Sequence, residues 1–229
     1  MALPDKLPAP VEPQPLVYRF PSGFRATEGG ASLNWPPGQG PFGQVTRAEP
    51  NPAIATVQWV ADALSPDECA AVVAEGKSLP SHDGRVELGA NSYRVSHIAW
   101  IEPNERTNWL FHRLGVLFTN VNRAYGFDMI GFVDALQFTE YGPEQHFDWH
   151  LDIGRDQSSL RKVSMTIQLS ADGDYDGGEL DFIGLAPNAQ SRVQGSATFF
   201  PSYLGHRVRP VTRGVRRSLV AWGSGLPFR

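Results

Sequence analysis

The stretch EQHFDWHLDIG, residues 144–154, decides how the rest of the chain is interpreted. Side chains with metal-binding groups recur in it at every second position, which in a β-strand puts all four on one face: His146, Asp148, His150 and Asp152. A strand rises about 3.3 Å per residue, so the four span about 20 Å and one small ion cannot touch them all. Two neighbouring members of the set lie about 7 Å apart at the backbone, close enough to share an ion. Spacing alone therefore allows either His146 with Asp148 or His150 with Asp152 to bind the ion.

The segments on both sides also have the pattern of β-strands, short apolar alternations separated by glycine, proline and aspartate. Strands are predicted over 55–60, 132–141, 145–152, 162–170, 179–183, 197–201, 206–211 and 217–222. Two helices are predicted before most of these strands. A run of strands after helices indicates a mainly β fold, a sandwich or barrel, with the helices on one side.

The first predicted helix covers residues 66–76. Ser65 is an N-cap residue, Pro66 occupies the first helical position and Glu68 follows the cap by three residues, which is the pattern of a capping box. The second predicted helix covers residues 108–124, where leucine, phenylalanine and valine recur every three to four residues. That spacing indicates packing by one face.

The beginning of the chain differs from the rest in composition. Of the 19 prolines, 11 lie within the first 52 residues, which excludes regular helix or central strand there. The chain is 229 residues long, so we expect a proline-rich arm over 1–52 and one domain over 53–229. The arm is interpreted as a clamp over the surface of the domain, or alternatively as a substrate-binding or dimer-forming segment.

The charge and cysteine content of the chain limit its expected cellular location and its expected binding partners. The chain has no apolar run of membrane-spanning length, no signal-peptide pattern at its start and a single cysteine, Cys69, so a cytoplasmic protein is expected. With 20 basic and 24 acidic residues, the net charge of −4 gives no global reason to bind nucleic acid or anionic lipid.

A metal bound by one of the two pairs needs a third ligand, and His206 is the best placed of the remaining histidines. It opens the alternating stretch HRVRPVTRGVRRSLVAW, in which Arg216 follows ten residues later and Ser218 two after that. Two histidines and one carboxylate on one face of an iron leave three positions open, as in non-haem Fe(II) oxygenases. A 2-oxo acid can occupy two of these positions and leave the last for dioxygen. An arginine such as Arg216, with Ser218 as a second donor, can hold the far carboxylate of that acid.

These residues resemble the Fe(II)/2-oxoglutarate-dependent dioxygenases, specifically their prolyl 4-hydroxylase-like branch, over about residues 53–224. The resemblance rests on YGPEQHFDWHLD at 141–152, GGEL at 177–180 and GHRVRPVTRGVRRSLVAW at 205–222. It implies that His150 and Asp152, rather than the earlier pair, bind iron together with His206. It also implies the fold, a double-stranded β-helix or jelly-roll (cupin-like) barrel with iron at one mouth.

The same resemblance implies the roles of the residues around the iron. Arg216 would bind the C5 carboxylate of 2-oxoglutarate with Ser218 beside it, and Tyr141 would help to hold this cosubstrate. Trp222 would line the pocket. Gln168 stands where relatives often have a tyrosine that touches 2-oxoglutarate, so it is a candidate cosubstrate contact. No catalytic residue apart from the iron ligands is implied; the cofactors would be Fe(II), 2-oxoglutarate and O2, with ascorbate as a further candidate.

The implied activity is hydroxylation of an unactivated C–H bond with release of succinate and CO2. The branch favours a prolyl residue in a peptide or protein as substrate; a free amino acid or other small metabolite, and a non-catalytic jelly-roll binding module, remain alternatives. Five arginines lie between positions 207 and 217. The nucleic-acid demethylase branch, however, typically carries a second arginine six residues after the first, where this chain has Trp222. Neither nucleic acid nor membrane is therefore expected as a partner, and the oligomeric state is open.

Overall fold

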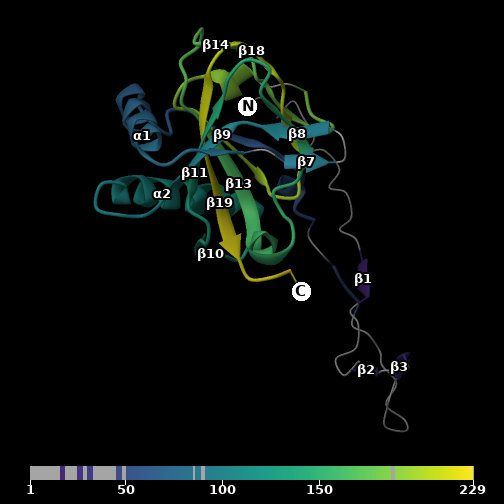
Figure 1. Cartoon of the computed structure of the whole chain (residues 1–229). Coiled ribbons are helices and arrows are strands. Elements are labelled where there is room, and N and C mark those ends of the chain that lie inside the picture. The colour runs from purple at the N-terminus through teal and green to yellow at the C-terminus, as the bar shows by residue number, and fades with distance from the viewer. Residues whose placement is uncertain are drawn as a thin grey trace, which may run out of the picture. The chain divides into compact units, whose positions relative to one another are not determined.

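The computed structural model describes residues 50–84, 86–88, 91–186 and 189–228, and four short strands before them (Figure 1). These strands are β1 (Leu16–Tyr18), β2 (Arg25–Thr27), β3 (Gly30–Ser32) and β4 (Val45–Arg47). β1 pairs with β4 and β2 pairs with β3, in both cases antiparallel. The interpretation of residues 1–52 as a clamp or binding arm depends on side chains outside the described residues and stays a prediction.

The larger sheet has eight strands, with the order β5-β16-β13-β19-β11-β9-β6 and β10 paired to β19. Its strands are β5 (Gln58–Val60), β6 (His82–Asp83), β9 (His97–Ile101), β10 (Met129–Phe132), β11 (Leu136–Tyr141), β13 (Arg161–Gln168), β16 (Ala197–Pro201) and β19 (Arg216–Gly225). Every pairing in it is antiparallel. The long strands β13 and β19 lie at its centre.

The smaller sheet has five strands, in the order β15-β17-β12-β8-β7. They are β7 (Val86–Leu88), β8 (Asn91–Val95), β12 (His146–His150), β15 (Leu180–Phe182) and β17 (His206–Val208). A separate pair is formed by β14 (Tyr175–Gly177) and β18 (Val211–Gly214). From β11 onward the chain passes back and forth between the sheets, which is the topology of a double-stranded β-helix. The predicted fold class is therefore confirmed.

Two α-helices lie on one side of the larger sheet (Figure 1). α1 (Pro66–Ser78) begins with the predicted capping box: the Ser65 hydroxyl accepts a hydrogen bond from the Glu68 amide, and the Glu68 carboxylate accepts one from the Ser65 amide. α2 (Asn108–Tyr125) ends at Gly126, which adopts a left-handed conformation. Both helices occur where the sequence predicts them. Three short 3-10 helices, Pro52–Ala55, Asp156–Leu160 and Ala189–Arg192, lie in connections.

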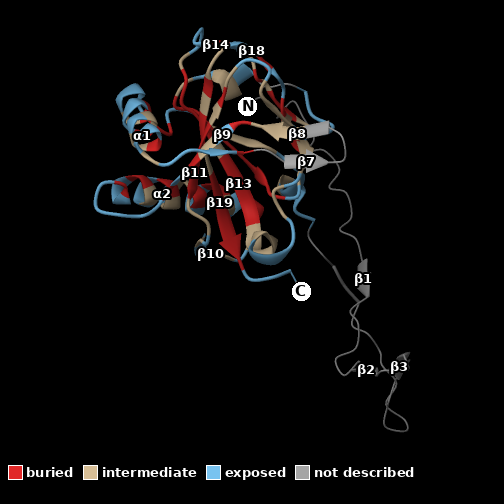
Figure 2. Cartoon of the chain, in the orientation of Figure 1, coloured by how far each residue is buried: buried red, intermediate tan, exposed pale blue. Residues whose placement is uncertain are grey.

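The main hydrophobic core fills the space between these helices and the larger sheet. Phe118 of α2 packs edge-to-face against Phe199 of β16, with ring centroids 5.1 Å apart. From β13 the alternate side chains of Val163, Met165 and Ile167 enter this core and are fully buried. Figure 2 shows the result: the central strands are buried, and the helices are buried only on the side that faces them. The opposite face of the larger sheet is thereby left to face the smaller sheet.

Four parts of the strand prediction are corrected. The predicted strand 206–211 ends at residue 208, and residue 211 begins the separate strand β18. The predicted strand 55–60 is a 3-10 turn followed by the shorter β5. The predicted strand 132–141 is two strands, β10 and β11, separated by residues 133–135. Strands β6 to β9, residues 82–101 with gaps, were not predicted. A strand such as β9, with Ala99 and Ile101 buried in the helix-side core and Ile98 and Trp100 on the other face, lacks the polar alternation that reveals a half-exposed strand.

Candidate metal centre

The three predicted metal ligands come together where β12 and β17 pair in the smaller sheet. His150 is the last residue of β12 and lies opposite His206, the first residue of β17. Asp152 lies just beyond the strand, where its backbone N–H donates to the carbonyl of Ser202. The expectation that Asp152 shares one continuous strand with His146 is wrong. The turn after His150 lets the carboxylate face both histidines.

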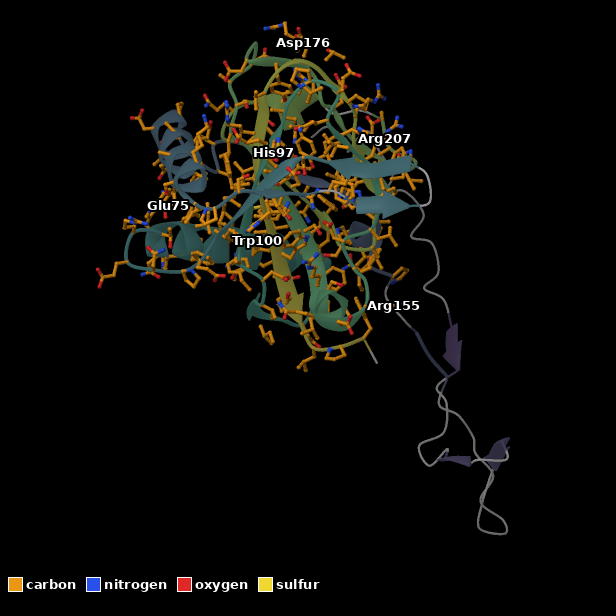
Figure 3. The ribbon with its side chains drawn as sticks, viewed as in Figure 1. Glu75, His97, Trp100, Arg155, Asp176 and Arg207 are labelled. Carbon is orange, nitrogen blue, oxygen red and sulfur yellow. The ribbon has the colours of Figure 1, made fainter. Side chains whose placement is uncertain are left out.

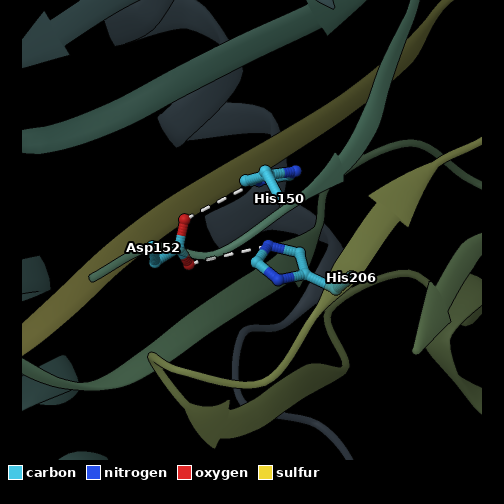
Figure 4. Close-up of side chains that lie close together, drawn as sticks. All are labelled: His150, Asp152 and His206. Atoms are coloured by element: carbon cyan, nitrogen blue, oxygen red, sulfur yellow. Dashed lines mark ion pairs between the residues drawn. The ribbon is translucent and has the colours of Figure 1, made fainter. Parts of the chain in front are cut away.

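The geometry of the three side chains is compact (Figure 4). His150 Nε2 lies 3.8 Å from Asp152 Oδ1, and His206 Nε2 lies 3.6 Å from Asp152 Oδ2. One ligand atom from each residue falls within 4.8 Å of the others. All three side chains are at most 10% exposed. Two imidazoles and one carboxylate around a common point are the donor set of a non-haem iron site with open positions.

Backbone carbonyls fix the tautomer of both histidines. The Nδ1 atom of His150 lies 2.7 Å from the carbonyl oxygen of Asp148, and Nδ1 of His206 lies 2.9 Å from that of Leu204. A carbonyl oxygen can only accept, so each Nδ1 carries the proton and donates it. The Nε2 lone pairs therefore point toward Asp152, available to a metal.

The protonation states of these groups also suit a cation. Burial, with the neighbouring His206, lowers the pKa of His150 to about 4, so this imidazole is neutral at neutral pH. Burial opposes ionisation of Asp152, but the two imidazoles and a hydrogen bond from Ser164 keep its pKa below the ordinary value. The site thus presents a neutral imidazole at His150 and an ionised carboxylate at Asp152, as metal ligation requires.

The residues predicted to hold 2-oxoglutarate lie on the larger sheet, on the face turned toward the metal ligands. Arg216 is buried, pairs across the sheet with Tyr141 and donates from Nη1 to the Ser218 hydroxyl, 3.3 Å away. Burial raises the pKa of Tyr141, against the effect of nearby arginines, so its hydroxyl stays protonated and can donate a hydrogen bond. These three side chains give one end of the site a set of donors for an anion.

Gln168 and Trp222 lie on the same two strands. The register places Gln168 of β13 opposite Ser218 of β19, where it is buried; its amide nitrogen donates to the carbonyl of Ser170 and its Oε1 has no hydrogen-bond partner among the described residues. It is not among the residues that line the cavity described below. Trp222 lines that cavity and lies opposite Ser164. The assigned roles of both residues stay predictions.

His146 and Asp148 lie outside the cluster of ligand atoms. His146 Nδ1 contacts the carbonyl of Glu144 at 3.2 Å, and Asp148 is exposed with its carboxylate accepting from the amide of Trp149. The pairing of β12 with β17 has a bulge between Phe147 and His150, so Asp148 lies within the bulge and His146 lies before it. The structure therefore places together the pair that the resemblance favours.

A cavity of about 300 Å³ between the two sheets joins the metal ligands to Arg216. Its floor includes a row of side chains that the strand register brings side by side across the larger sheet: Trp100 (labelled in Figure 3), Gln137, Val220 and Thr166. Two further arginines, Arg94 of β8 and Arg161 of β13, also line it. Neither arginine was predicted from the sequence. Arg94 lies on β8, whereas Ile98 and Trp100 lie on β9 of the other sheet, so no alternation within one strand indicates Arg94.

The arginine-rich stretch 207–217 is paired with acidic side chains. Arg207 and Arg209 both contact Asp181 Oδ2, at 2.9 and 2.6 Å. Arg213 pairs with Asp176 and Arg217 with Glu140, at 2.6 and 2.7 Å. The remaining member, Arg216, is buried in the cavity wall. The stretch is a set of ion pairs on strands rather than an unpaired basic surface.

Residues 136–224 match the family model of the 2OG-Fe(II) oxygenase superfamily. A PKHD-type hydroxylase of Synechococcus sp. (strain JA-2-3B'a(2-13)) is 39% identical over 82 residues, which are 35% of this chain and 37% of that protein. Another, from Synechococcus sp. (strain CC9902), is 27% identical over 142 residues, 61% of this chain and 64% of that protein. The chain thus matches little more than a third of the length of the first of these relatives.

Solved structures share the fold. A prolyl-4-hydroxylase from Pseudomonas putida superposes with a TM-score of 0.60 and 26% identity over 76% of this chain and 96% of that chain. A 2OG-Fe(II) oxygenase family oxidoreductase from Burkholderia pseudomallei gives a TM-score of 0.60 at 20% identity, over 75% of this chain and 86% of its own. Among the described residues, neither helix has the length and hydrophobicity needed to cross a membrane.

Proposed function

Because residues 136–224 match the family model of the 2OG-Fe(II) oxygenase superfamily, we propose that the chain is an iron(II)- and 2-oxoglutarate-dependent hydroxylase of unactivated C–H bonds. The observation that carries the proposal is the placement of two ligand groups in one cavity. The cluster of His150, Asp152 and His206 lies at one end, and Arg216 with Ser218 lies at the other. One cavity can therefore accept a metal and a dicarboxylate together.

The residues of this chain supply binding and orientation. His150, Asp152 and His206 would hold Fe(II), which supplies the oxidative chemistry that converts 2-oxoglutarate and O2 to succinate and CO2. Arg216 and Ser218 would donate to the C5 carboxylate, and the protonated hydroxyl of Tyr141 would add a donor. Burial of these donors strengthens their hold on an anion, because water does not compete for them.

For the substrate, we propose a prolyl residue. The likeness to a prolyl-4-hydroxylase at 26% identity, over almost the whole of that chain, supports this choice. Leu151 and Trp100 line the cavity while remaining partly exposed, which gives its opening apolar side chains suited to an uncharged ring.

The test is formation of succinate from 2-oxoglutarate by purified protein with Fe(II) and ascorbate, with and without a proline-rich peptide. We expect succinate to depend on iron and to increase with the peptide. His150→Ala should abolish iron binding, measured as metal content after dialysis, and with it succinate formation.

His146→Ala is the matched control, because it removes an imidazole from the same strand but outside the cluster. It should retain iron. Loss of iron from the His146 variant but not from the His150 variant would reverse the choice of ligand pair. Absence of succinate from iron-loaded protein under every condition would favour a non-catalytic binding module.

A further inference from the structure

Three arginines line the cavity, and they differ in how their charges are compensated. Arg161 pairs with Asp134 at 2.9 Å, donates to the carbonyl of Asp152 and lies 3.8 Å over the Trp222 ring. Its charge is neutralised within the protein. Arg216 has no acidic partner among the described residues, and the carboxylate of 2-oxoglutarate would compensate it under the proposed function.

Arg94 differs from both, because neither an acidic side chain of the described residues nor the proposed cosubstrate compensates its charge. Its Nε donates to the Ser96 hydroxyl at 2.9 Å, and its guanidinium group also hydrogen-bonds with the neutral Tyr141 hydroxyl. Its Nη2 is shielded from solvent and has no hydrogen-bond partner among the described residues, and no carboxylate there forms an ion pair with it. A buried guanidinium nitrogen without an acceptor is costly, so this group needs an acceptor from a bound molecule.

Arg94 and Arg216 both lie near Tyr141, but they reach the cavity from different sheets. Arg94 belongs to β8 of the smaller sheet, whereas Arg216 belongs to β19 of the larger sheet. The guanidinium carbon of Arg94 lies 4.8 Å from the centre of the Phe147 ring, which itself stacks on the His150 ring at 3.4 Å. Arg94 and the metal ligand His150 thus both pack against the Phe147 ring.

The charges of the cavity-lining residues also favour an anionic ligand at Arg94. Asp152 is the one acidic side chain among the described lining residues, and it is committed to the metal. A dianionic cosubstrate has one carboxylate for the metal and one for Arg216. A second guanidinium on the opposite wall therefore matches an additional carboxylate.

We propose that Arg94 forms a carboxylate-binding subsite for the substrate that is hydroxylated, so that this substrate carries a free carboxylate near the carbon that reacts. The inference rests on the proposed hydroxylase function. It narrows the proposed substrate from any prolyl residue to one that has a carboxylate close to the reacting carbon. Arg94 would hold the carboxylate by a charge-assisted hydrogen bond from Nη2.

The test compares two probes that differ only in this group, N-acetyl-L-proline and N-acetyl-L-prolinamide. The protein is loaded with Mn(II) in place of iron and with saturating 2-oxoglutarate. Binding is followed by the fluorescence of Trp100 and Trp222, both in the cavity wall. We expect the acid to bind at least tenfold more tightly than the amide. Arg94→Gln should weaken binding of the acid by roughly 10- to 100-fold and leave binding of the amide unchanged. Arg94→Lys should restore part of the lost affinity for the acid.

Arg106→Gln is the matched control, because this arginine is exposed and pairs with Glu75 away from the cavity. It should change neither affinity, and thermal melting should show that all variants are folded. Equal affinity of wild-type protein for acid and amide, or no saturable binding of the acid, would overturn the proposal. So would an Arg94→Gln variant that loses affinity for 2-oxoglutarate instead, because Arg94 would then serve the cosubstrate. Failure of wild-type protein to bind 2-oxoglutarate at all would instead contradict the proposed function.

Discussion

At the scale of single residues, the site depends on side chains held in one protonation state. The carbonyls of Asp148 and Leu204 orient the two imidazoles, and burial keeps His150 neutral. Sequence spacing could predict which residue types meet a metal, because the two histidines and the aspartate occupy recognisable positions. It could not predict that Asp152 leaves the strand, because that turn depends on a hydrogen bond to Ser202, 50 residues away.

Neutral His150 makes the stability of the metal-free protein depend on pH. Its pKa is about 4 in the folded protein, lowered from 6.5 first by burial. Between these two values the unfolded chain binds the proton more readily, so stability present above pH 6.5 is lost as the pH falls toward 4. The loss should reach about 3 kcal/mol. Urea unfolding of metal-free protein at pH 7, 5.5 and 4 measures it.

His150→Gln is the comparison for this experiment, since glutamine does not titrate while every other ionisable group is kept. Wild-type protein should lose more stability than the variant over this range. Parallel curves for the two proteins would show that His150 takes up its proton equally well when folded.

At the scale of elements, a pair of glycines before β15 makes room for Arg216, the proposed cosubstrate contact. Gly177 and Gly178 both have positive φ, 73° and 65°. A Cβ on Gly178 would lie 2.9 Å from Cδ of Arg216 and 3.0 Å from Cγ2 of Val211. The sequence indicated a turn at this pair, but the contact with Arg216 joins residues 38 positions apart and depends on how β14 and β18 pair.

Gly178→Ala should therefore displace the Arg216 side chain. We expect the dissociation constant for 2-oxoglutarate, measured on Mn(II)-loaded protein by calorimetry, to rise roughly tenfold or more. Gly173→Ala is the matched control, because Gly173 also has positive φ, 94°, but has no atom within 4 Å of an added Cβ. Equal effects of the two substitutions would mean that backbone strain, rather than contact with Arg216, is responsible.

The elements also show where prediction from sequence works. α1 has its start signals within four residues, Ser65 to Glu68, so local sequence defines it. β8 and β9 have no comparable local signal, because both faces of β9 are covered, one by the helix-side core and the other by the cavity. Arg94 was missed for this reason: its role depends on a strand that pattern analysis did not find.

At the scale of the whole molecule, the cavity is lined by residues of both sheets, and the groups proposed to bind ligands come from both. His150 and His206 belong to the smaller sheet, and Arg216 and Ser218 to the larger. A ligand that contacts both the metal ligands and Arg216 therefore links the two sheets. Binding should therefore stabilise the domain as a unit, because the unfolded chain has no such site.

We expect Mn(II) with 2-oxoglutarate at 100 times its dissociation constant to add about 2.7 kcal/mol beyond the effect of Mn(II) alone. In a domain of this size that corresponds to a rise in Tm of roughly 5–10 °C, measurable by calorimetry. Arg216→Gln, loaded with the same metal and tested at the same 2-oxoglutarate concentration, should lose most of this increment. An equal increment in wild type and variant would place the dicarboxylate elsewhere.

The alternation along β13 also has a practical consequence. Val163 and Ile167 are embedded under the helices, whereas Thr166 on the other side lines the cavity next to Val220 of β19. Mutant libraries for directed evolution can therefore randomise Thr166 and Val220 to reshape substrate preference, with the helix-side positions left untouched. The residues that hold the domain folded and the residues that select its substrate are interleaved in sequence but separable in an engineering campaign.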